Sequence, residues 1–558
     1  MPSATSGLLV DDHAHAGFIL QHLLQAHAGW WDLFNTCCRE GTPSVSERIA
    51  LGMLPWWTDP HLSMALFRPL SVATQYLDYL LWPNAPVLMH LHNMAWYAAI
   101  VALVGAFYRG MMGGGIAALA LLMYAVAASH AEGAAWIADR NTVMSAAFAL
   151  AALVSYDRLR RAAWRPGAWI APLALLLGLA SGEGAIAAWG YLVPYALWID
   201  RGPAGKRALP LAPMAVVTLG WCILYRKLGY GVHGGGWYRD PFDAPRFFLM
   251  RRVPDALPGI LREEFLPGAS AARAWPFVFV TPWAFRITLA VCVLTLPLWL
   301  LMLVRRREIA FWSFALFASA LPICAIGVAP RLFFLSSVAS FALIAEVLGQ
   351  LWTLARAPAL RGGWPLRMAA LLLAGAWLAV HGPLALALAP HAYRANVDFE
   401  QLFVTSAQRL PAFDRAKVDT LFVLNTPNYL VTQASPAYAL SRPWPSKLYV
   451  LGATFMPVRI SRPDAFTVRL TPLGGYLLEP VSQFVRAPEV PFSPGQTIQV
   501  GPLTARVEEV MPDGRPAAMS FRSEQLAAAN QLWVAWYGDR YHAIPLPRVG
   551  TDVDIPGF

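Results

Sequence analysis

Long apolar segments joined by short loops fill most of the sequence between residues 90 and 388 and restrict what the chain can fold into. A helix needs about 20 mainly apolar residues to cross a lipid bilayer. About ten segments approach that length, near residues 90–108, 113–129, 141–157, 167–182, 184–199, 208–225, 286–304, 309–328, 333–353 and 367–388. Only 14% of the 558 residues are charged, against about a quarter in soluble domains. The sequence therefore predicts a polytopic α-helical membrane protein.

The basic residues indicate which side of the membrane each loop occupies. A net charge of +10 would suggest nucleic acid binding in a soluble protein. Here the arginines and lysines gather in every second connection between spans, at Arg109, Arg158, Arg160, Arg161, Arg165, Arg201, Lys206, Arg207, Arg305, Arg306, Arg307, Arg356, Arg361 and Arg367. The positive-inside rule makes these loops cytoplasmic. The other loops are expected on the periplasmic side of a bacterial inner membrane, and no nucleic acid partner is expected.

This assignment places residues 1–89 outside the membrane, although neither a signal peptide nor an apolar span precedes them in the sequence. We therefore expect the native chain to begin one helix earlier. Within residues 1–89, the aromatic and apolar stretch 70–82 predicts an amphipathic helix on the outer membrane surface. The expected division is an external segment 1–89, a transmembrane domain 90–388 and a C-terminal domain 389–558.

The C-terminal segment 389–558 has a different pattern. Short alternating runs at 420–424, 447–451, 466–470, 497–500 and 532–537 lie between turns rich in Pro, Gly and Asp. Strands bounded by such turns are typical of β structure. We expect a mainly β domain in the periplasm, whose aromatic end could either stack on sugars or fill its own core.

Candidate site residues lie in the loops of the predicted outer side. Asp11 and Asp12 are adjacent carboxylates next to His13 and His15, and could provide a general base or hold a cation. A solvated turn or helix cap is the alternative. A divalent cation is possible, but no ligand spacing identifies its site, so metal dependence is left open.

Further charged residues lie in or next to the predicted spans. If 130–140 is helical, Glu132 and Arg140 share one face, which could anchor the chain at the interface or, together with His130, form the wall of a reaction cavity. Glu183 and Arg331 have apolar neighbours, where an ionisable group is costly and is a functional candidate by default. No GK[ST] P-loop, GxGxxG strand-turn-helix or HExxH motif is present, so nucleotide chemistry is not indicated.

The order of these motifs resembles the GT-C superfamily of membrane glycosyltransferases, with the closest likeness to the protein O-mannosyltransferase-like branch. The motifs are Asp11-Asp12, Phe67-Arg68-Pro69-Leu70, Leu77-Asp78-Tyr79, His90 to Asn93, His130-x-Glu132-x-x-x-Trp136-Ile137-x-x-Arg140, Ser181-Gly182-Glu183 and Arg331 to Ser337. They extend over roughly residues 10–345. The resemblance also implies a helix before the acidic pair.

The resemblance implies an inverting transfer of a hexosyl, mannosyl or pentosyl group from a polyprenyl-phosphate donor to a protein, lipid or glycan hydroxyl. By position, Asp11 or Asp12 would be the base and Glu132 a second acidic residue. Donor-phosphate or cavity residues would be Arg68, His130, Arg140, Glu183 and Arg331. The sequence departs from the family pattern at Gly182, where a lysine is common, and at Leu332, where a tyrosine is usual.

Two functions from other classes remain open at this point. Buried charges and an external polar cavity would also suit a transporter or flippase of lipid-linked sugars. Such carriers often show related halves or paired broken helices, and no such symmetry is evident in the sequence. A non-catalytic GT-C-like envelope scaffold is the third possibility, with the C-terminal domain binding a glycan or an envelope partner.

Overall fold

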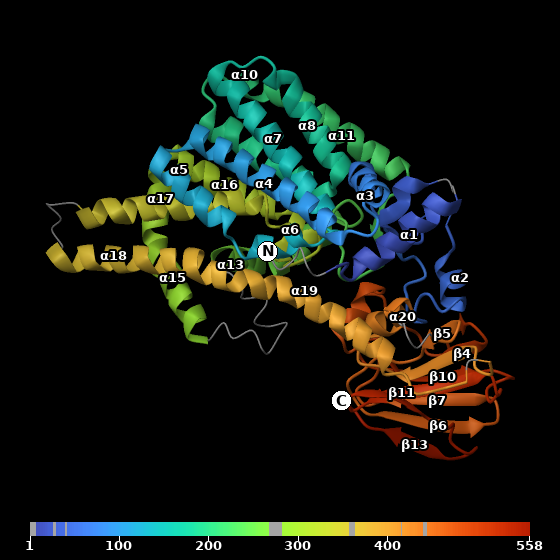
Figure 1. The fold of residues 1–558 in the computed structure, drawn as a ribbon. Coiled ribbons are helices and arrows are strands. Elements are labelled where there is room, and N and C mark those ends of the chain that lie inside the picture. The colour runs from blue at the N-terminus through green and yellow to red at the C-terminus, as the bar shows by residue number, and fades with distance from the viewer. Residues whose placement is uncertain are drawn as a thin grey trace. The chain divides into compact units, whose positions relative to one another are not determined.

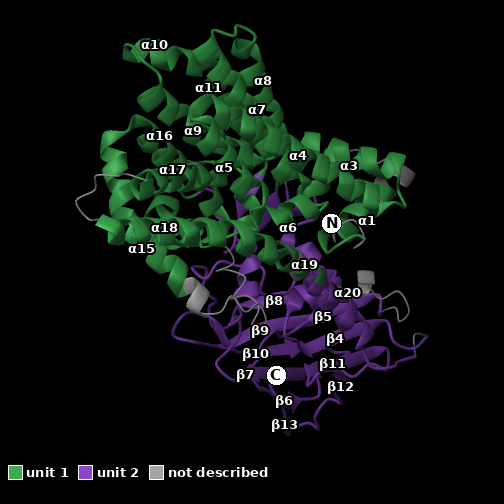
Figure 2. Ribbon diagram, turned by 60° about the vertical axis from the view of Figure 1, so that its left-hand side comes forward, with its two compact units in different colours: residues 1–34, 66–230, 244–397 green, residues 35–65, 231–243, 398–558 purple. Residues whose placement is uncertain are grey.

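A computed structural model of the chain describes residues 7–25, 29–39, 42–266, 282–356, 363–414, 416–438 and 444–557. The chain forms two compact units, coloured separately in Figure 2. The first, which we call the helical unit, contains residues 1–34, 66–230 and 244–397. The second, the β-rich unit, contains residues 35–65, 231–243 and 398–558.

These units do not follow the expected boundaries at 89 and 388. Segments 35–65 and 231–243 join the C-terminal segment in the β-rich unit, because their short strands β1 (Asn35–Cys37), β2 (Ser63–Ala65) and β3 (Gly231–His233) pair with one another. Trp56 is fully buried, and its indole N–H donates to the Leu451 carbonyl at 2.9 Å. At the other boundary, helix α19 (Ala385–Gln408) runs through residue 388 without a break.

The helical unit contains the apolar segments that the sequence predicts, and Figure 1 labels most of its helices. They are α1 (Asp11–Gln25), α3 (Pro69–Leu81), α4 (Pro86–Met111), α5 (Gly114–Ala125), α6 (Ser129–Ala135), α7 (Arg140–Ala162), α8 (Gly167–Ser181), α9 (Trp189–Pro194), α10 (Ala204–Ala208), α11 (Ala212–Lys227), α12 (Pro245–Phe247), α13 (Val253–Phe265), α15 (Pro282–Arg305), α16 (Arg307–Ala320), α17 (Ser336–Arg356), α18 (Gly363–Ala379) and the first part of α19.

Among the described residues, the helices long and apolar enough to cross a membrane number fewer than the ten candidate segments. Seven qualify among the described residues, or eight if α5 and α6, bent by 59°, form one span. Helix α8 has only 15 residues. Segment 184–199 divides into a 3-10 helix (Glu183–Ala188), α9 and a π-helix (Tyr195–Ile199). Pro194 lies at the last of these junctions, where its missing N–H removes a helical hydrogen bond.

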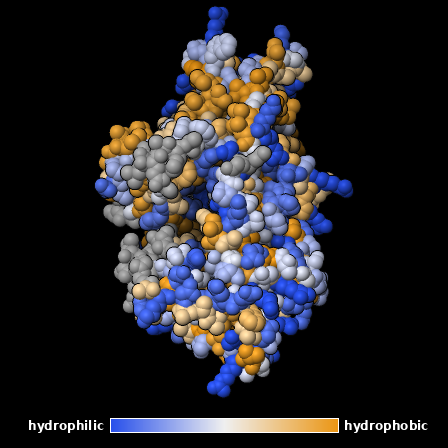
Figure 3. Space-filling view, turned by 90° about the vertical axis from the view of Figure 1, so that its right-hand side faces the viewer, coloured by the Kyte–Doolittle hydropathy of each residue, from blue (hydrophilic) through white to orange (hydrophobic). Residues whose placement is uncertain are grey.

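Apolar side chains on the outside of the helical unit support its assignment to the membrane. Trp169 and Leu173 on α8, and Val216, Leu219 and Ile223 on α11, are all exposed. Figure 3 shows apolar residues gathered over the upper part of one face of the molecule. Exposed apolar surface of this kind is unfavourable in water and suits contact with lipid. The chain is thus a polytopic helical protein with a β-rich C-terminal region, as predicted.

Helix α3 confirms the predicted helix near 70–82. Its Val72 and Tyr79 are buried, whereas Leu77, Leu80 and Leu81 are exposed. An apolar core joins this helix to α1, α4 and the loop after α6 through Ile19, Val72, Tyr79, Met89 and Ile137. The packing fixes α1 against α3, so the acidic first turn of α1 has a defined position.

The β-rich unit contains two larger sheets. An antiparallel six-stranded sheet has the order β13-β6-β7-β10-β9-β8, built from β6 (Val458–Asp464), β7 (Thr467–Pro472), β8 (Thr497–Val500), β9 (Leu503–Val510), β10 (Pro516–Arg522) and β13 (Asp552–Ile555). A four-stranded sheet has the order β12-β11-β4-β5, built from β12 (Arg540–Ala543), β11 (Gln531–Tyr537), β4 (Thr420–Asn425) and β5 (Lys447–Val450). All five predicted runs lie on these strands. The parallel pairing of β4 with β5 across helix α20 (Tyr429–Tyr438) was not predicted.

Candidate active site

A charged cluster in the helical unit brings together most of the predicted site residues. We define the charged cluster as Asp11, Arg68, Glu132, Asp139, Glu183 and Arg331. Its members come from the start of α1, the residue before α3, helix α6 and the loop after it, the residues after α8 and the short turn Pro330–Leu332. The cluster thus forms where the ends of separate helices meet.

Arg68 and Glu183 form the first ion pair of the cluster. Arg68 Nε lies 2.8 Å from Glu183 Oε2, and the two side chains are 15% and 29% exposed. The Ser71 hydroxyl donates to the Ser181 carbonyl at 2.7 Å, which joins the start of α3 to the end of α8. The Tyr225 hydroxyl donates to Glu183 Oε1 at 3.2 Å. Glu183 is therefore held on both oxygens while its side chain stays accessible.

Arg331 forms the second part of the cluster. Its Nη1 lies 3.5 Å from Glu132 Oε1, its Nε lies 3.9 Å from Asp139 Oδ2, and its guanidinium carbon lies 5.0 Å from the centre of the Trp136 ring. The Arg331 side chain is 26% exposed. Its backbone carbonyl approaches α6 closely, because a Cβ added to Gly133 would lie 2.9 Å from that oxygen. Only glycine fits there without displacing this segment.

Asp139 connects the two arginines. Burial raises the pKa of Asp139 to about 6, and the positive charges of Arg331 and Arg68 oppose this shift. When the Asn141 amide is oriented to suit its neighbours, its nitrogen donates to the Ala138 carbonyl at 3.1 Å and its oxygen accepts from Arg68 Nη1 at 3.0 Å. Loop 136–139 therefore contacts Arg331 through Asp139, and the first turn of α7 contacts Arg68 through Asn141.

Asp11 provides the exposed carboxylate of the cluster. It lies in the first turn of α1, one helical turn before His15. Burial lowers the pKa of His15, and the charges of Asp11 and Arg68 act on the same ring in opposite directions. The Arg68 guanidinium lies 4.8 Å from the centre of the Phe34 ring, and His15 packs edge-on against that ring at 5.1 Å. The charges of Asp11 and Arg68 thus both act on one imidazole.

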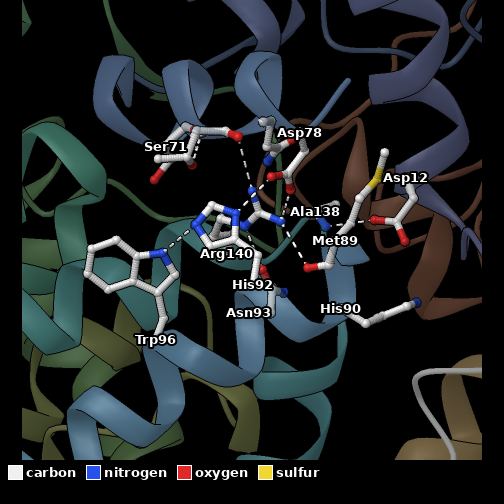
Figure 4. Close-up of polar contacts among 12 residues, drawn as sticks. Asp12, Ser71, Asp78, Met89, His90, His92, Asn93, Trp96, Ala138 and Arg140 are labelled. Atoms are coloured by element: carbon white, nitrogen blue, oxygen red, sulfur yellow. Dashed lines mark hydrogen bonds and ion pairs between the residues drawn. The ribbon is translucent and has the colours of Figure 1, made fainter. Parts of the chain in front are cut away.

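Asp12 is buried, in contrast to Asp11. Its Oδ2 accepts the N–H of Leu9 at 2.9 Å, and its Oδ1 accepts the N–H of Ala138 at 2.6 Å. Burial raises the pKa of Asp12 to about 7, although both hydrogen bonds oppose the shift. Figure 4 shows the contact with Ala138. The adjacent carboxylates therefore have different environments, and Asp12 connects α1 to the loop that carries Asp139.

Arg140 lies in the interior and not on an accessible surface. Its side chain has no exposed area and forms an ion pair with Asp78. Its Nε donates to Asn93 Oδ1 at 2.5 Å, and its Nη atoms donate to the carbonyls of Thr74 and Met89 at 3.2 Å each. Figure 4 shows Arg140 directed toward Asp78. The structure thus separates Arg140 from the charged cluster and places it where α3, α4 and α7 meet.

His130 is also buried, although it was expected at a cavity wall. Its ring stacks on Phe334 with centroids 4.9 Å apart, and its Nδ1 lies 3.2 Å from both the Tyr97 hydroxyl and the Tyr124 carbonyl. These aromatic neighbours fix α6 against the segment after Arg331. His130 therefore supports the site without lining it.

Sequence reasoning missed Asp139 and Tyr225 as members of the site. Asp139 lies between Trp136 and Arg140, so its place inside a recognised motif was an available signal. Tyr225 has no comparable signal, because it lies in the last turn of an apolar helix and reaches Glu183 only through the fold. Within the described ranges, no group of three or more His, Cys, Asp or Glu residues is placed to hold a metal ion. A divalent cation thus stays an untested expectation.

Known proteins are similar to parts of this chain. No family model matches it. Over 166 residues it is 29% identical to protein O-mannosyl-transferase TMTC3 of Homo sapiens, and the aligned segment covers 29% of this chain and 16% of that protein. The match confirms the likeness to O-mannosyltransferases that the motifs predict. It leaves most of the relative's length unmatched.

Two groups of solved structures are also similar. ArnT from Cupriavidus metallidurans in the apo state has a TM-score of 0.35 and 14% identity, with 77% of this chain and 85% of that chain covered. The Archaeoglobus fulgidus oligosaccharyltransferase in the apo form has a TM-score of 0.40 and 11% identity, with 78% and 63% covered. ArnT bound to undecaprenyl phosphate has a TM-score of 0.33 and 13% identity, with 77% and 85% covered.

Proposed function

We propose that this protein is an inverting glycosyltransferase that moves a sugar from a polyprenyl-phosphate donor to an acceptor hydroxyl on the outer face of the membrane. One observation carries the proposal: the charges of the partly exposed Arg68 and Arg331 both act on the Asp139 carboxylate, and those of Arg68 and the exposed Asp11 both act on the His15 ring. Positive charge for a departing phosphate and a carboxylate for an incoming hydroxyl are the two requirements of this reaction.

The arginines would stabilise the leaving phosphate. As the bond between the anomeric carbon and the phosphate oxygen breaks, negative charge develops on that oxygen. A guanidinium offers several N–H donors in a planar fork and keeps its charge at all relevant pH values. The contacts of Arg331 with Glu132 and Asp139 are longer than the 2.8 Å contact of Arg68 with Glu183. Because the Arg331 side chain is 26% exposed, we assign it the principal phosphate contact.

Asp11 would act as the general base. The acceptor hydroxyl oxygen attacks the anomeric carbon from the face opposite the phosphate, and its proton moves to the Asp11 carboxylate. One bond forms as the other breaks, so the anomeric configuration inverts. Asp12 cannot easily take this role, because both of its oxygens accept backbone N–H groups in a buried position. Asp12 is instead a positioning residue for loop 136–139.

The membrane part of the structure suits a lipid-linked donor. The exposed apolar side chains of α8 and α11 face outward from the helical unit, and a polyprenyl tail can remain in the same lipid phase. The similarity to an O-mannosyl-transferase supports transfer of a hexose such as mannose, and a pentose is the alternative. Of the protein, lipid and glycan acceptors, the same similarity favours a protein hydroxyl.

The test of these roles compares single variants of the purified protein in proteoliposomes with a labelled polyprenyl-phosphate sugar. Asp11→Asn should lower the transfer rate by about 10²–10⁴-fold, the usual contribution of general-base catalysis. Asp255→Asn is the matched control, because Asp255 is another exposed carboxylate in the first turn of a helix of the helical unit. Thermal unfolding of each variant verifies that the fold is retained.

Three results would contradict the proposal. Normal transfer by Asp11→Asn would remove Asp11 from the mechanism. Movement of the intact lipid-linked sugar between leaflets, without cleavage, would instead indicate a transporter or flippase. Absence of both activities, with several donor sugars and acceptors, would favour the non-catalytic scaffold.

A further inference from the structure

Helix α13 carries a buried carboxylate that the proposed mechanism does not use. Glu264 lies near the end of α13 and is 4% exposed. Its Oε1 accepts the hydroxyl of Ser336, and its Oε2 accepts the hydroxyls of Ser337 and Ser340 at 2.9 Å and 2.8 Å. A carboxylate is costly to bury unless its oxygens accept hydrogen bonds. The three serines therefore bind Glu264 to the beginning of α17.

The same serines lie directly behind the turn that carries Arg331. Ser336 is the first residue of α17 and follows Arg331 by five positions. The Ser337 N–H donates to the Phe333 carbonyl at 2.8 Å, and the Ser336 hydroxyl lies 3.2 Å from the same oxygen. The beginning of α17 is thus joined to Glu264 on one side and to the residues after Arg331 on the other.

Two tyrosines hold the backbone between Arg331 and α17. The Tyr124 hydroxyl donates to the Phe334 carbonyl at 2.8 Å. The Tyr191 hydroxyl donates to the Leu335 carbonyl at 2.5 Å. Both tyrosines are fully buried. The peptide groups that follow the turn therefore keep one position relative to α17, and a displacement of α17 would also displace Arg331.

Arg252 holds the other side of the turn. It is the last residue of the π-helix Phe248–Arg252, and α13 begins at the next position. Its Nε donates to the Cys324 carbonyl at 2.9 Å, and its Nη2 donates to the Ile326 carbonyl at 2.7 Å. Both carbonyls lie in the segment that leads into the turn. One short region of the chain, from Arg252 to Glu264, therefore contacts the segments on both sides of the turn.

Helix α13 also packs closely against these two segments. A Cβ added to Gly259 of α13 would lie 2.6 Å from Cγ2 of Val328, so glycine permits this close approach. One apolar core contains Ile260 of α13, Ile323 before the turn and Phe333 after it, and all three are buried. The apolar core and the polar contacts therefore hold the same part of the chain.

We infer that Glu264 and Arg252 are positioning residues that hold the Arg331 guanidinium in place for the donor phosphate. The inference rests on the phosphate contact proposed for Arg331. Glu264 does not contact the donor itself, because it is buried and both of its oxygens accept serine hydroxyls. Positive charge stabilises a developing anion most when it is fixed in position beforehand. Loss of Glu264 should therefore weaken the action of Arg331.

The experiment compares two substitutions of Glu264 in the reconstituted full-length protein. Glu264→Ala removes the acceptor that three serines share, whereas Glu264→Gln keeps the size of the side chain and one oxygen that accepts a hydroxyl. Glu346→Ala is the matched control, because Glu346 is a carboxylate of α17 that is also 4% exposed and pairs with Arg306 at 2.7 Å. Glu346 lies ten positions after Ser336, or about 15 Å along the helix, and so reports the effect of lost stability alone.

Transfer rates are measured with the donor and acceptor concentrations varied separately. Glu264→Ala should lower kcat/KM for the donor by about tenfold or more, because a small misplacement of a reacting group has effects of this size. The kcat/KM for the acceptor should fall less, and Glu264→Gln should restore most of the loss. In an Arg331→Ala background, Glu264→Ala should cause little further loss, because its effect passes through Arg331. Glu346→Ala should affect donor and acceptor alike.

Three results would overturn the inference. The first is an equal loss of kcat/KM for donor and acceptor in Glu264→Ala, and the second is full additivity of Glu264→Ala with Arg331→Ala. The third is the same donor-selective loss in Glu346→Ala. Should Glu264→Ala fail to fold, Arg252→Met decides the outcome by the same criteria, because it removes the hydrogen bonds to the two carbonyls before the turn.

Binding of farnesyl phosphate, measured by isothermal titration calorimetry, separates this inference from the proposed function. The probe has a phosphate and a short polyprenyl chain but no sugar. Weaker binding by both Glu264→Ala and Arg331→Ala, in a protein that transfers no sugar, would support the positioning role and contradict the transferase. Unchanged probe affinity and unchanged kcat/KM for the donor in Glu264→Ala would overturn the positioning role and leave the transferase intact. Wild-type protein that neither binds the probe nor transfers sugar would overturn both.

Discussion

The Asp12 carboxylate accepts the backbone N–H of Ala138 at 2.6 Å, across 126 positions of the sequence. The same side chain accepts the N–H of Leu9 at 2.9 Å. This contact fixes the first turn of α1 against the loop that carries Asp139. The placement of the exposed Asp11 therefore depends on its buried neighbour.

Asp12→Ala should destabilise the protein, because it leaves two backbone N–H groups without their acceptor. An orphaned buried donor costs about 1–3 kcal/mol, so the melting temperature in detergent should fall clearly. Asp11→Ala is the control and should leave the melting temperature close to wild type, because Asp11 is exposed. Equal melting temperatures for the two variants would contradict the positioning role of Asp12.

Stability should depend on pH through Asp12. Folding raises the pKa of Asp12 from 3.8 to about 7, so the folded protein holds this proton more tightly than the unfolded chain. Its contribution to stability is fully present below the unfolded pKa and is lost as the pH rises through about 7. As the pH rises from 3.8 to about 7, the wild-type protein should therefore lose stability relative to Asp12→Asn. Parallel melting curves of the two proteins across this range would contradict the assignment.

The buried pair of Asp78 and Arg140 should behave as a structural unit. Removal of one partner leaves an uncompensated charge and costs about 3–5 kcal/mol, whereas replacement of both by apolar residues of similar size is much less harmful. Asp78→Leu, which leaves the buried Arg140 guanidinium without its carboxylate, should therefore be less stable than the double variant Asp78→Leu/Arg140→Met. Thermal unfolding measures the difference, and a double variant that loses more stability than the single one would contradict this interpretation.

Gly133→Ala should impair the site by displacing Arg331. The added methyl group would lie 2.9 Å from the Arg331 carbonyl oxygen and 3.0 Å from the Phe334 ring. Overpacking of this kind costs about 1–3 kcal/mol, and relief requires the Arg331 segment to move. Gly115→Ala is the control, because nothing lies within 4 Å of a Cβ at that position. Transfer rates should fall only in Gly133→Ala, and an equal effect of both substitutions would contradict the claim.

Arg331→Ala should affect donor use more than acceptor use. Loss of preorganised positive charge at a developing anion costs about 10²–10³-fold in rate. When the donor and acceptor concentrations are varied separately, kcat/KM for the donor should fall more than kcat/KM for the acceptor. Arg140→Ala should not show this difference between donor and acceptor, because loss of the buried Arg140 should lower the stability of the protein instead. Equal losses of kcat/KM for the donor and the acceptor would count against a phosphate contact.

The sequence predicted the membrane character, the β-rich C-terminal region and the residues Arg68, Glu132, Glu183 and Arg331 that the structure brings into one cluster. Hydropathy and charge are local properties, so a sequence shows them directly. The site residues were found because short motifs kept a recognisable order. Their roles in the reaction stay predictions.

Other features depend on contacts between distant segments, which a single sequence does not reveal. Asp11 and Asp12 look alike in the sequence, and only the approach of Ala138 distinguishes the buried carboxylate from the exposed one. The partner of Arg140, Asp78, lies on another helix, so the sequence does not reveal their ion pair. Arg140 was therefore predicted to be a cavity residue. Residues 35–65 join the β-rich unit through strand pairing and the burial of Trp56. Each of these outcomes is decided by tertiary structure.

The central claim is that the protein cleaves a polyprenyl-phosphate sugar and transfers the sugar with inversion. The most direct measurement incubates the reconstituted protein with an anomerically defined, labelled donor and an acceptor, and analyses both products by mass spectrometry and NMR. We expect equal amounts of free polyprenyl phosphate and a glycoside of inverted configuration. A glycoside of retained configuration, or translocated donor that stays intact, would contradict it.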